Sequence, residues 1–329
     1  MIEIRSHSLR NLDTLAENHR LELKPVIMAR IGALKTRQQN FISQHIDQIL
    51  SAKPRELASL LIDYKRFCTS PGRSALLPKN INNGLKGVFN YKHFARTNAP
   101  ITEYSAYTLV KKLNVNTCPY CNRNYTITVD KTKRVTRPDI DHFISQGKNP
   151  LLGLSFYNLI PSCLVCNRSV KNQQPTVYGR FIHPYEEGFG TATKFNFLSL
   201  DVDSLTGLSE NYLVTLEHNP LEPQKVIRCI NNCKLFKLPE IYDACHHGEI
   251  ADIVRKHYIS GGKYLEMLHS TFPGLGTIDD LYKIAFGTYW QEDDFIKRPL
   301  SKLTKDIVEQ LVFLNPIKLK TIISDYWAL

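Results

Sequence analysis

Two C-x-x-C pairs constrain this 329-residue chain more than any other feature of its sequence. Cys118-Pro-Tyr-Cys121 and Cys163-Leu-Val-Cys166 are separated by 41 residues. Paired thiolates at such spacing are typical ligands of a structural zinc ion, which is tetrahedral and bound by four protein side chains. The sequence therefore predicts a four-cysteine zinc site that fixes a small fold around residues 118–166.

The polar residues between the two cysteine pairs are candidates for chemistry. A zinc ion held by four cysteines has no open position for a substrate, so a reaction here would need other side chains. The intervening segment contains Asp139-Ile140-Asp141-His142 and Asn158-Leu159, and Asn167 directly follows the fourth cysteine. The alternative, a zinc ribbon that only supports structure, would not need an Asp-His pair or an asparagine at these places.

These residues carry a resemblance to a known family. The run Asp139-Ile-Asp-His142-Phe, followed by Tyr157-Asn158-Leu159-Ile-Pro-Ser-Cys163-Leu-Val-Cys166-Asn167-Arg-Ser-Val-Lys171, resembles the HNH endonucleases (ββα-metal or His-Me finger nucleases) of the four-cysteine zinc subclass. The resemblance covers roughly residues 115–185 and contains the cysteines, the histidine and both asparagines in family order. It departs from the family where Asn167 replaces the final histidine, a substitution also met in active members.

The resemblance implies phosphodiester hydrolysis with one catalytic divalent metal ion. His142, whose unperturbed pKa lies near neutrality, would be the general base that takes a proton from water, and the main chain near Asn158 would fix its ring. Asp141 and Asn167 offer hard oxygen ligands suited to Mg²⁺ or Mn²⁺, and Asp139 is a further candidate ligand or orienting group. The candidate catalytic residues are therefore His142, Asp141, Asn158 and Asn167.

The sequence around Asp141 and His142 predicts a hairpin. Residues 125–129 alternate as a strand, residues 130–133 form a polar turn, and residues 135–140 give a second short strand. The hairpin is expected to deliver Asp141 and His142 at its end.

A loop and a short helix are expected to follow. Residues 150–158 are predicted to be a loop, and Ser162 is predicted to cap a helix that starts near Cys163. On that helix we expect Asn167 to face the hairpin and Cys166 to face the zinc ion.

Composition favours a polyanionic partner. The chain has 42 Lys and Arg against 31 Asp and Glu, a formal net charge of +11, which favours association with nucleic acid phosphates. Runs of charge are usually a solvated face, and here they are interpreted as phosphate contacts only because they flank the catalytic candidates. The leading candidates for nucleic-acid binding, the predicted basic rim, are Lys131, Lys133, Arg134, Arg168 and Lys171.

Helical spacing in the flanking segments predicts a mainly α protein. The resemblance implies that a ββα-metal (HNH) module, fixed by the four-cysteine zinc site, is inserted between these segments. We expect an N-terminal helical region over residues 1–112, the nuclease module over 113–186 and a mainly helical C-terminal region over 187–329. The N-terminal sequence lacks the apolar core of a signal peptide, and no apolar run approaches a membrane span. A soluble, cytoplasmic protein without a membrane partner is therefore expected.

The C-terminal region offers a second, weaker metal pattern. Residues 194–202 and 212–217 are predicted to be short strands, and residues 222–329 are predicted to be helical. Cys229 and Cys233 lie one helical turn apart and Cys245-His246-His247 follows, which leaves open a second metal site. The alternative, core cysteines and surface histidines, is favoured because this region has no C-x-x-C pair.

Together these observations predict a metal-dependent HNH endonuclease that hydrolyses phosphodiester bonds, with DNA as the expected substrate. The arrangement also resembles the nuclease subunits of bacterial anti-phage systems, such as Septu-type pairs in which an ATPase accompanies the HNH protein. The alternative is that the protein is not an enzyme but a catalytically silent, zinc-containing module that only binds nucleic acid.

Overall fold

The computed structural model describes residues 1–6, 11–68, 79–98, 100–130 and 134–313, which divide between two compact units. The first unit contains residues 3–120 and 125–188. The second unit contains the residues from 189 onward, together with the short segments 1–2 and 121–124. The expected N-terminal helical region and nuclease module thus lie mostly in one unit, and the second unit begins two residues after the expected start of the C-terminal region.

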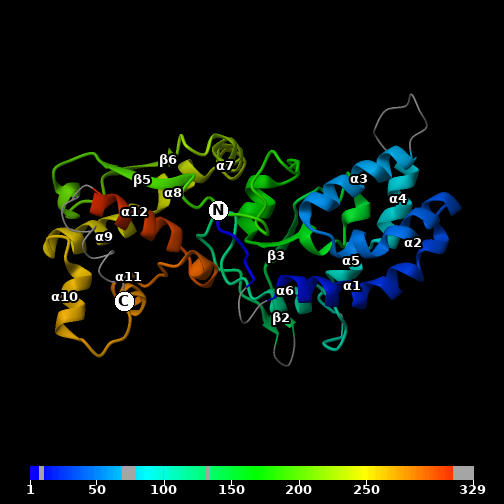
Figure 1. Ribbon diagram of the computed structural model, residues 1–329, viewed down its shortest axis with the longest axis horizontal. Coiled ribbons are helices and arrows are strands. Elements are labelled where there is room, and N and C mark those ends of the chain that lie inside the picture. Colours follow the sequence, from blue (N-terminus) through cyan, green and yellow to red (C-terminus); the bar gives the residue numbers. More distant parts are fainter. Residues whose placement is uncertain (7–10, 69–78, 99, 131–133, 314–329) are drawn as a thin grey trace. The chain divides into compact units, whose positions relative to one another are not determined.

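Helices make up most of the first unit, where α1 packs on α2 and α2 packs on α3 (Figure 1). The bounds before residue 120 are α1 Leu12–Met28, the 3-10 turn η1 Ile31–Ala33, α2 Thr36–Ser51, α3 Pro54–Cys68, α4 Lys79–Val88, α5 Tyr91–Phe94 and α6 Ala106–Leu113.

The α2–α3 contact follows from an apolar stripe on each helix. In α3, Leu57, Leu60, Leu61 and Tyr64 recur at three- and four-residue intervals and are all buried, as expected for one face of an amphipathic helix. Pro54 is the first residue of α3, a position at which its missing N–H removes no intrahelical hydrogen bond.

The described strands of the first unit form two separate antiparallel pairs. The strand β1 (Val129–Asp130) pairs with β2 (Arg134–Thr136), and β3 (Asp139–His142) pairs with β4 (Leu159–Ser162). The expected hairpin exists as β1–β2, but the expectation that it delivers Asp141 and His142 is wrong, because both residues belong to β3. Pro138 lies between β2 and β3 and has no N–H to donate, so the first ladder ends before it.

The segment between β3 and β4 and the helix after β4 also differ from expectation. The predicted loop contains two buried 3-10 turns, η2 (Pro150–Leu152) and η3 (Phe156–Asn158). The helix is η4 (Val165–Lys171), a π-helix in which Asn172 N donates to Asn167 O at 3.0 Å. Ser162 does not cap it: Ser162 is the last residue of β4, and its buried hydroxyl has no hydrogen-bond partner within the described structure.

In its described residues, the second unit combines one antiparallel strand pair with helices. The strand β5 packs on α12 and β6 packs on α8 (Figure 1), and the core between them includes Phe195, Tyr242, Leu303 and Ile307. The bounds are β5 Thr193–Ser199, η5 Asp203–Thr206, β6 Tyr212–His218, α7 Pro223–Phe236, α8 Leu238–Cys245, α9 His247–Ile259, α10 Tyr264–Thr271, α11 Ile278–Phe286, η6 Glu292–Lys297 and α12 Ser301–Phe313.

The element types expected after residue 190 are confirmed over the described part of that region. Both predicted strands are present as β5 and β6, and they are followed by helices up to residue 313. Among the described helices, none combines the length and the apolar character needed to cross a bilayer.

Candidate metal centre and candidate active site

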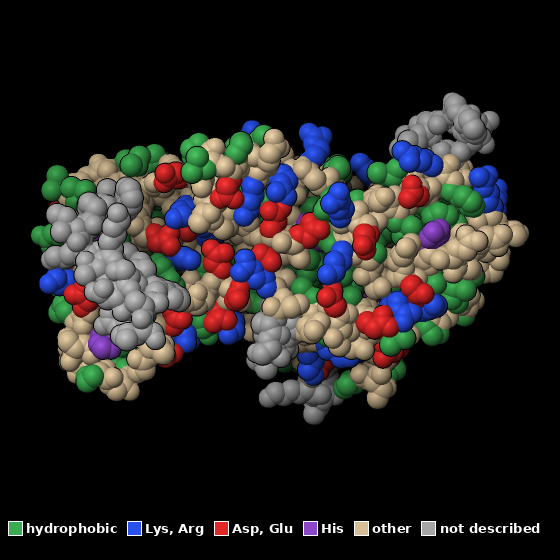
Figure 2. All heavy atoms as spheres, viewed as in Figure 1, with side chains coloured by type: hydrophobic (Ala, Val, Ile, Leu, Met, Phe, Trp, Pro, Cys, Tyr) green, Lys and Arg blue, Asp and Glu red, His purple; other side chains and the backbone are tan. Residues whose placement is uncertain are grey.

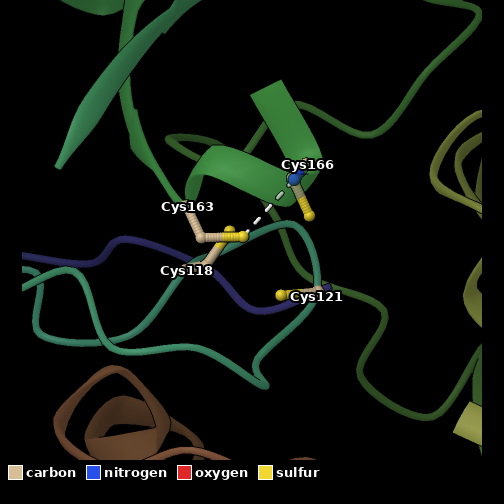
Figure 3. Close-up of side chains that lie close together, drawn as sticks. All are labelled: Cys118, Cys121, Cys163 and Cys166. Carbon is tan, nitrogen blue, oxygen red and sulfur yellow. Dashed lines mark hydrogen bonds between the residues drawn. The ribbon is translucent and has the colours of Figure 1, made fainter. Parts of the chain in front are cut away.

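The four cysteines of the C-x-x-C pairs converge on one point. Their Sγ atoms all lie within 4.8 Å of one another, and all four side chains are buried. Figure 3 shows Cys118 and Cys121 approaching from one loop, while Cys163 and Cys166 come from the end of β4 and the start of η4. Four thiols at this separation could hold a metal ion such as zinc, as the sequence predicts.

Backbone amides support two of the sulfur atoms. Arg123 N donates to Cys121 Sγ and Cys166 N donates to Cys163 Sγ, each at 3.4 Å. The turn after Cys121 needs a left-handed residue, and Asn122 takes that conformation with φ 53°, which asparagine tolerates better than most residues. Donated N–H groups stabilise sulfur in its anionic form, the form that binds a metal. The donor set and its hydrogen bonds therefore fit a Zn²⁺ ion.

The strand β3 presents its polar residues on two faces. Because side chains alternate along a strand, Asp139 and Asp141 share one face and His142 lies on the other. The partner strand holds this register through the pairs Asp141 with Ile160 and His142 with Leu159. Both aspartates contact residues of η4, whereas the imidazole of His142 contacts the loop between β3 and β4.

His142 is buried and fixed by the main chain. Its Nε2 lies 3.0 Å from Gly153 O, and its ring packs edge-on against Tyr91 with centroids 4.5 Å apart. A carbonyl oxygen can only accept, so Nε2 carries the proton and Nδ1 keeps the basic lone pair. Burial lowers the pKa of His142 to about 4, so the ring is neutral at neutral pH.

Asn158 fastens the loop that holds His142. Its Nδ2 donates to Ile144 O at 3.0 Å and to Leu152 O at 2.9 Å, and its Oδ1 accepts from Ile144 N at 2.6 Å. Its main-chain carbonyl accepts from Phe143 N. The sequence places the main-chain support of the ring near Asn158. The structure places it at Gly153, next to a carbonyl that the Asn158 side chain holds.

Asp141 lies in a buried ion pair. Its Oδ2 accepts from Tyr120 Oη at 2.6 Å and from Lys171 Nζ at 2.5 Å, and Lys171 Nζ also donates to His142 O at 2.9 Å. Burial, followed by the neighbouring Asp141 carboxylate, raises the pKa of Tyr120 well above its usual value. Lys171 is therefore an interior side chain and does not lie on the exposed basic rim that the sequence predicts.

Asp139 is paired with a surface residue. Arg168 donates to both of its carboxylate oxygens, from Nε and Nη2 at 2.7 Å each, and Asn167 Nδ2 donates to Oδ2 at 3.1 Å. Asn167 thus faces β3 while the adjacent Cys166 faces the cysteine cluster.

The predicted basic rim is only partly a surface feature. Lys131 and Lys133 lie outside the described residues. The Arg134 guanidinium donates to Pro100 O at 2.8 Å and lies over the Tyr107 ring at 5.1 Å, so it packs against its own chain. Arg168 is the exposed member among the three that the structure describes. On the face drawn in Figure 2, basic and acidic side chains are interspersed and do not form a single basic patch.

Three residues join this site without being singled out from the sequence. Tyr120 is one of the two residues inside the first C-x-x-C pair, a position that marks only a turn. Tyr91 lies in a separate helix, α5, and Gly153 contributes only its carbonyl. No sequence pattern marks Tyr91 or Gly153, because neither a ring contact nor a main-chain acceptor requires a fixed distance in sequence from His142.

The second metal pattern does not form a site. Cys229 and Cys233 are buried on α7, and among the described residues only the four cysteines of the C-x-x-C pairs form a group that could hold a metal ion. His246 instead accepts from Arg123 Nε at 2.7 Å. The favoured alternative is confirmed for its core cysteines, Cys229 and Cys233, but its expectation of surface histidines is wrong for His246, which is buried.

Comparison of the chain with protein-family models, with curated proteins and with solved structures finds no match.

Proposed function

We propose that this protein is a metal-dependent endonuclease of the HNH type that hydrolyses phosphodiester bonds, with DNA as its substrate. The observation that carries the proposal is that β3 holds Asp139, Asp141 and His142, and that Asn167 of η4 donates to Asp139 of this strand at 3.1 Å. The cluster of four cysteines includes Cys166 of the same helix. The family resemblance of these residues supports the same reaction class.

His142 would act as the general base. Its Nε2 donates to Gly153 O at 3.0 Å, so Nδ1 is the nitrogen that would accept a proton from water. Burial keeps the ring unprotonated at neutral pH. Asn158 would position the ring indirectly by fixing the loop that carries Gly153.

Asp139, Asp141 and Asn167 carry the oxygen atoms among which a divalent ion would find its ligands. Carboxylate and amide oxygens suit Mg²⁺ or Mn²⁺, and the contacts of all three with the β3–η4 frame bring them to one region of the first unit. Such an ion, when bound, would supply Lewis-acid stabilisation of the phosphate and the leaving oxygen.

The expected partners rest on charge and on the resemblance. The net charge of +11 and the exposed Arg168 support a polyanionic substrate. By the resemblance to Septu-type pairs, the nuclease would act in antiviral defence with an ATPase partner. Co-expression with an ATPase encoded beside this chain, followed by size-exclusion chromatography, tests that pairing.

A plasmid-nicking assay tests the proposal directly. The parent should nick supercoiled DNA in Mg²⁺ or Mn²⁺ and not in EDTA, and His142→Ala should be slower by about 10²–10⁴-fold under single-turnover conditions. His45→Ala, on α2 and outside the site, is the matched control and should cleave like the parent. A parent that binds DNA without cutting it in either metal would favour the silent binding module. Cleavage by His142→Ala at the parent rate would remove His142 as the base.

A further inference from the structure

The two aspartates of β3 have counter-ions of very different exposure. Asp141 pairs with Lys171, and the two side chains are 6% and 4% exposed. Asp139 pairs with Arg168, and here the carboxylate is 14% exposed while the guanidinium is 68% exposed. A cation that approaches either carboxylate must replace the side chain that already neutralises it, so this difference decides where a metal ion can enter.

Removing Lys171 from Asp141 would leave a buried ammonium group without its partner. Its Nζ is held by Asp141 and by His142 O, and the side chain has almost no contact with solvent. A buried charge without compensation is strongly unfavourable. A divalent ion at the same carboxylate would also place two cationic groups side by side in a site of low dielectric constant.

Removing Arg168 from Asp139 costs less than removing Lys171 from Asp141. The guanidinium is already mostly in water and remains solvated when the pair separates, whereas the Lys171 ammonium group would remain buried. Asn167 is suited to the same exchange. Its Nδ2 now donates to Asp139 at 3.1 Å, and a half-turn of the amide would present Oδ1, a hard oxygen ligand, in the same direction.

We infer that Asp139, together with Asn167, is where the divalent ion binds, and that Arg168 is an exchangeable counter-ion which occupies Asp139 until the ion arrives. This inference rests on the proposed function for the identity of the metal. It assigns Asp141 a different role: with Tyr120 and Lys171, it holds β3 against η4.

The exchange couples metal binding to substrate binding. Once Arg168 leaves Asp139, its guanidinium is released beside the metal site, where it can contact a phosphate. A phosphate that binds Arg168 also frees Asp139 for the ion. Because binding free energies are linked reciprocally, each ligand should tighten the binding of the other in the parent protein, and this mutual effect should be lost in Arg168→Gln.

Mn²⁺ titration followed by electron paramagnetic resonance, without nucleic acid, measures the exchange independently of activity. Arg168→Gln should bind Mn²⁺ about fivefold more tightly than the parent, which is the effect of an exposed ion pair near the upper end of its usual strength. Asp139→Asn should bind Mn²⁺ at least about tenfold more weakly. Arg66→Gln removes an exposed arginine that pairs with Asp63 on α3, far along the chain, and should match the parent.

Two results would overturn the inference. One is Mn²⁺ affinity in Arg168→Gln equal to or weaker than that of the parent. The other is parent-like Mn²⁺ affinity in Asp139→Asn. Arg168 is exposed and Asp139 pairs with it at the surface, so neither change should unfold the protein. Circular dichroism of each variant checks that the fold is retained.

The nicking assay separates this inference from the proposed function. Tighter Mn²⁺ binding by Arg168→Gln, with no DNA cleavage by the parent, would support the exchange and reject the nuclease. DNA cleavage by the parent, with unchanged Mn²⁺ affinity in Arg168→Gln, would support the nuclease and reject the exchange.

Discussion

Asn158 and His142 are joined through one stretch of loop. Asn158 Nδ2 donates to Leu152 O at 2.9 Å, and the carbonyl of the next residue, Gly153, lies 3.0 Å from His142 Nε2. The ring orientation of the proposed base therefore depends on a side chain sixteen positions away in the sequence. This arrangement gives Asn158 a positioning role without contact with the ring.

Asn158→Ala should loosen this loop. The change leaves Ile144 N, Ile144 O and Leu152 O without their present partners, and unsatisfied buried polar groups should lower the free energy of unfolding by ~3 kcal/mol. Nicking should fall by a similar factor at every Mg²⁺ concentration, because the metal ligands are unchanged. Urea denaturation and a metal titration of activity measure the two effects, with the exposed Asn40→Ala on α2 as control. Restoration of the parent rate by high Mg²⁺ would contradict the positioning role.

Lys171→Met should be among the most destabilising single changes in the first unit. It leaves Asp141 as a buried carboxylate without its cation, which costs ~3–5 kcal/mol of folding free energy. The double variant Asp141→Leu/Lys171→Met should recover most of that loss, because removing both charges also removes the unpaired one. Arg168→Gln should change stability by less than ~1 kcal/mol. Equal unfolding midpoints for Lys171→Met and Arg168→Gln in urea would show that the buried pair is not formed.

The cysteine spacing predicts the cluster because metal ligation imposes a rule on sequence. A C-x-x-C pair places two sulfurs on one turn, and two such pairs can share one ion. The alternation in residues 194–202 and 212–217 likewise predicts β5 and β6, since half-buried strands need that pattern. Both expectations depend on local geometry that the chain must satisfy within a few residues.

The surroundings of the aspartates could not be predicted in the same way. Lys171 and Arg168 both look like members of a basic rim in the sequence, and their difference in exposure comes from the π-helix η4, which directs the first toward Asp141 and leaves the second at the surface. The pairing of β3 with β4 depends on contacts between residues about twenty positions apart. Such contacts leave no periodic pattern in one sequence.

Stability should fall in mild acid, in part through His19. This residue is fully buried, with Nε2 2.7 Å from Leu154 O and Nδ1 2.8 Å from Tyr104 Oη. Burial lowers its pKa from 6.5 to about 4. Above pH 6.5 the ring is neutral in both states. Below pH 6.5 the imidazole is protonated in the unfolded chain but stays neutral in the folded chain. Stability is therefore lost as pH falls from about 6.5 to about 4.

The size of the effect follows from the shift in pKa. Each pKa unit corresponds to ~1.4 kcal/mol. His19 should therefore lower the free energy of unfolding by at most ~3 kcal/mol as pH falls through this range. Urea denaturation at pH steps from 7.5 to 4.5 measures the slope. His19→Gln should flatten it, whereas His45→Gln, on a partly exposed residue of α2, should not. A slope that is the same in His19→Gln and the parent would mean that His19 does not carry this linkage.

The cysteine cluster should bind one zinc ion per chain. Cys118, Cys121, Cys163 and Cys166 are buried within 4.8 Å of one another, and two of their sulfurs already accept backbone N–H groups. Because the unfolded chain has no preformed site, the free energy of zinc binding adds to the stability of the fold. Elemental analysis of purified protein should find about one zinc per chain, and a strong chelator should lower the melting temperature.

Substitution separates the cluster from the other cysteines. Cys163→Ser should lose the zinc and most soluble protein, because the hard hydroxyl is a poor zinc ligand and the neighbouring thiols lose their shared ion. Cys245→Ser alters an exposed cysteine outside the cluster and should keep the parent zinc content and melting temperature. Zinc-free protein that is folded and stable would reject the structural zinc site. Two zinc ions per chain would instead require a second site, for which Cys229 and Cys233 are the first residues to replace.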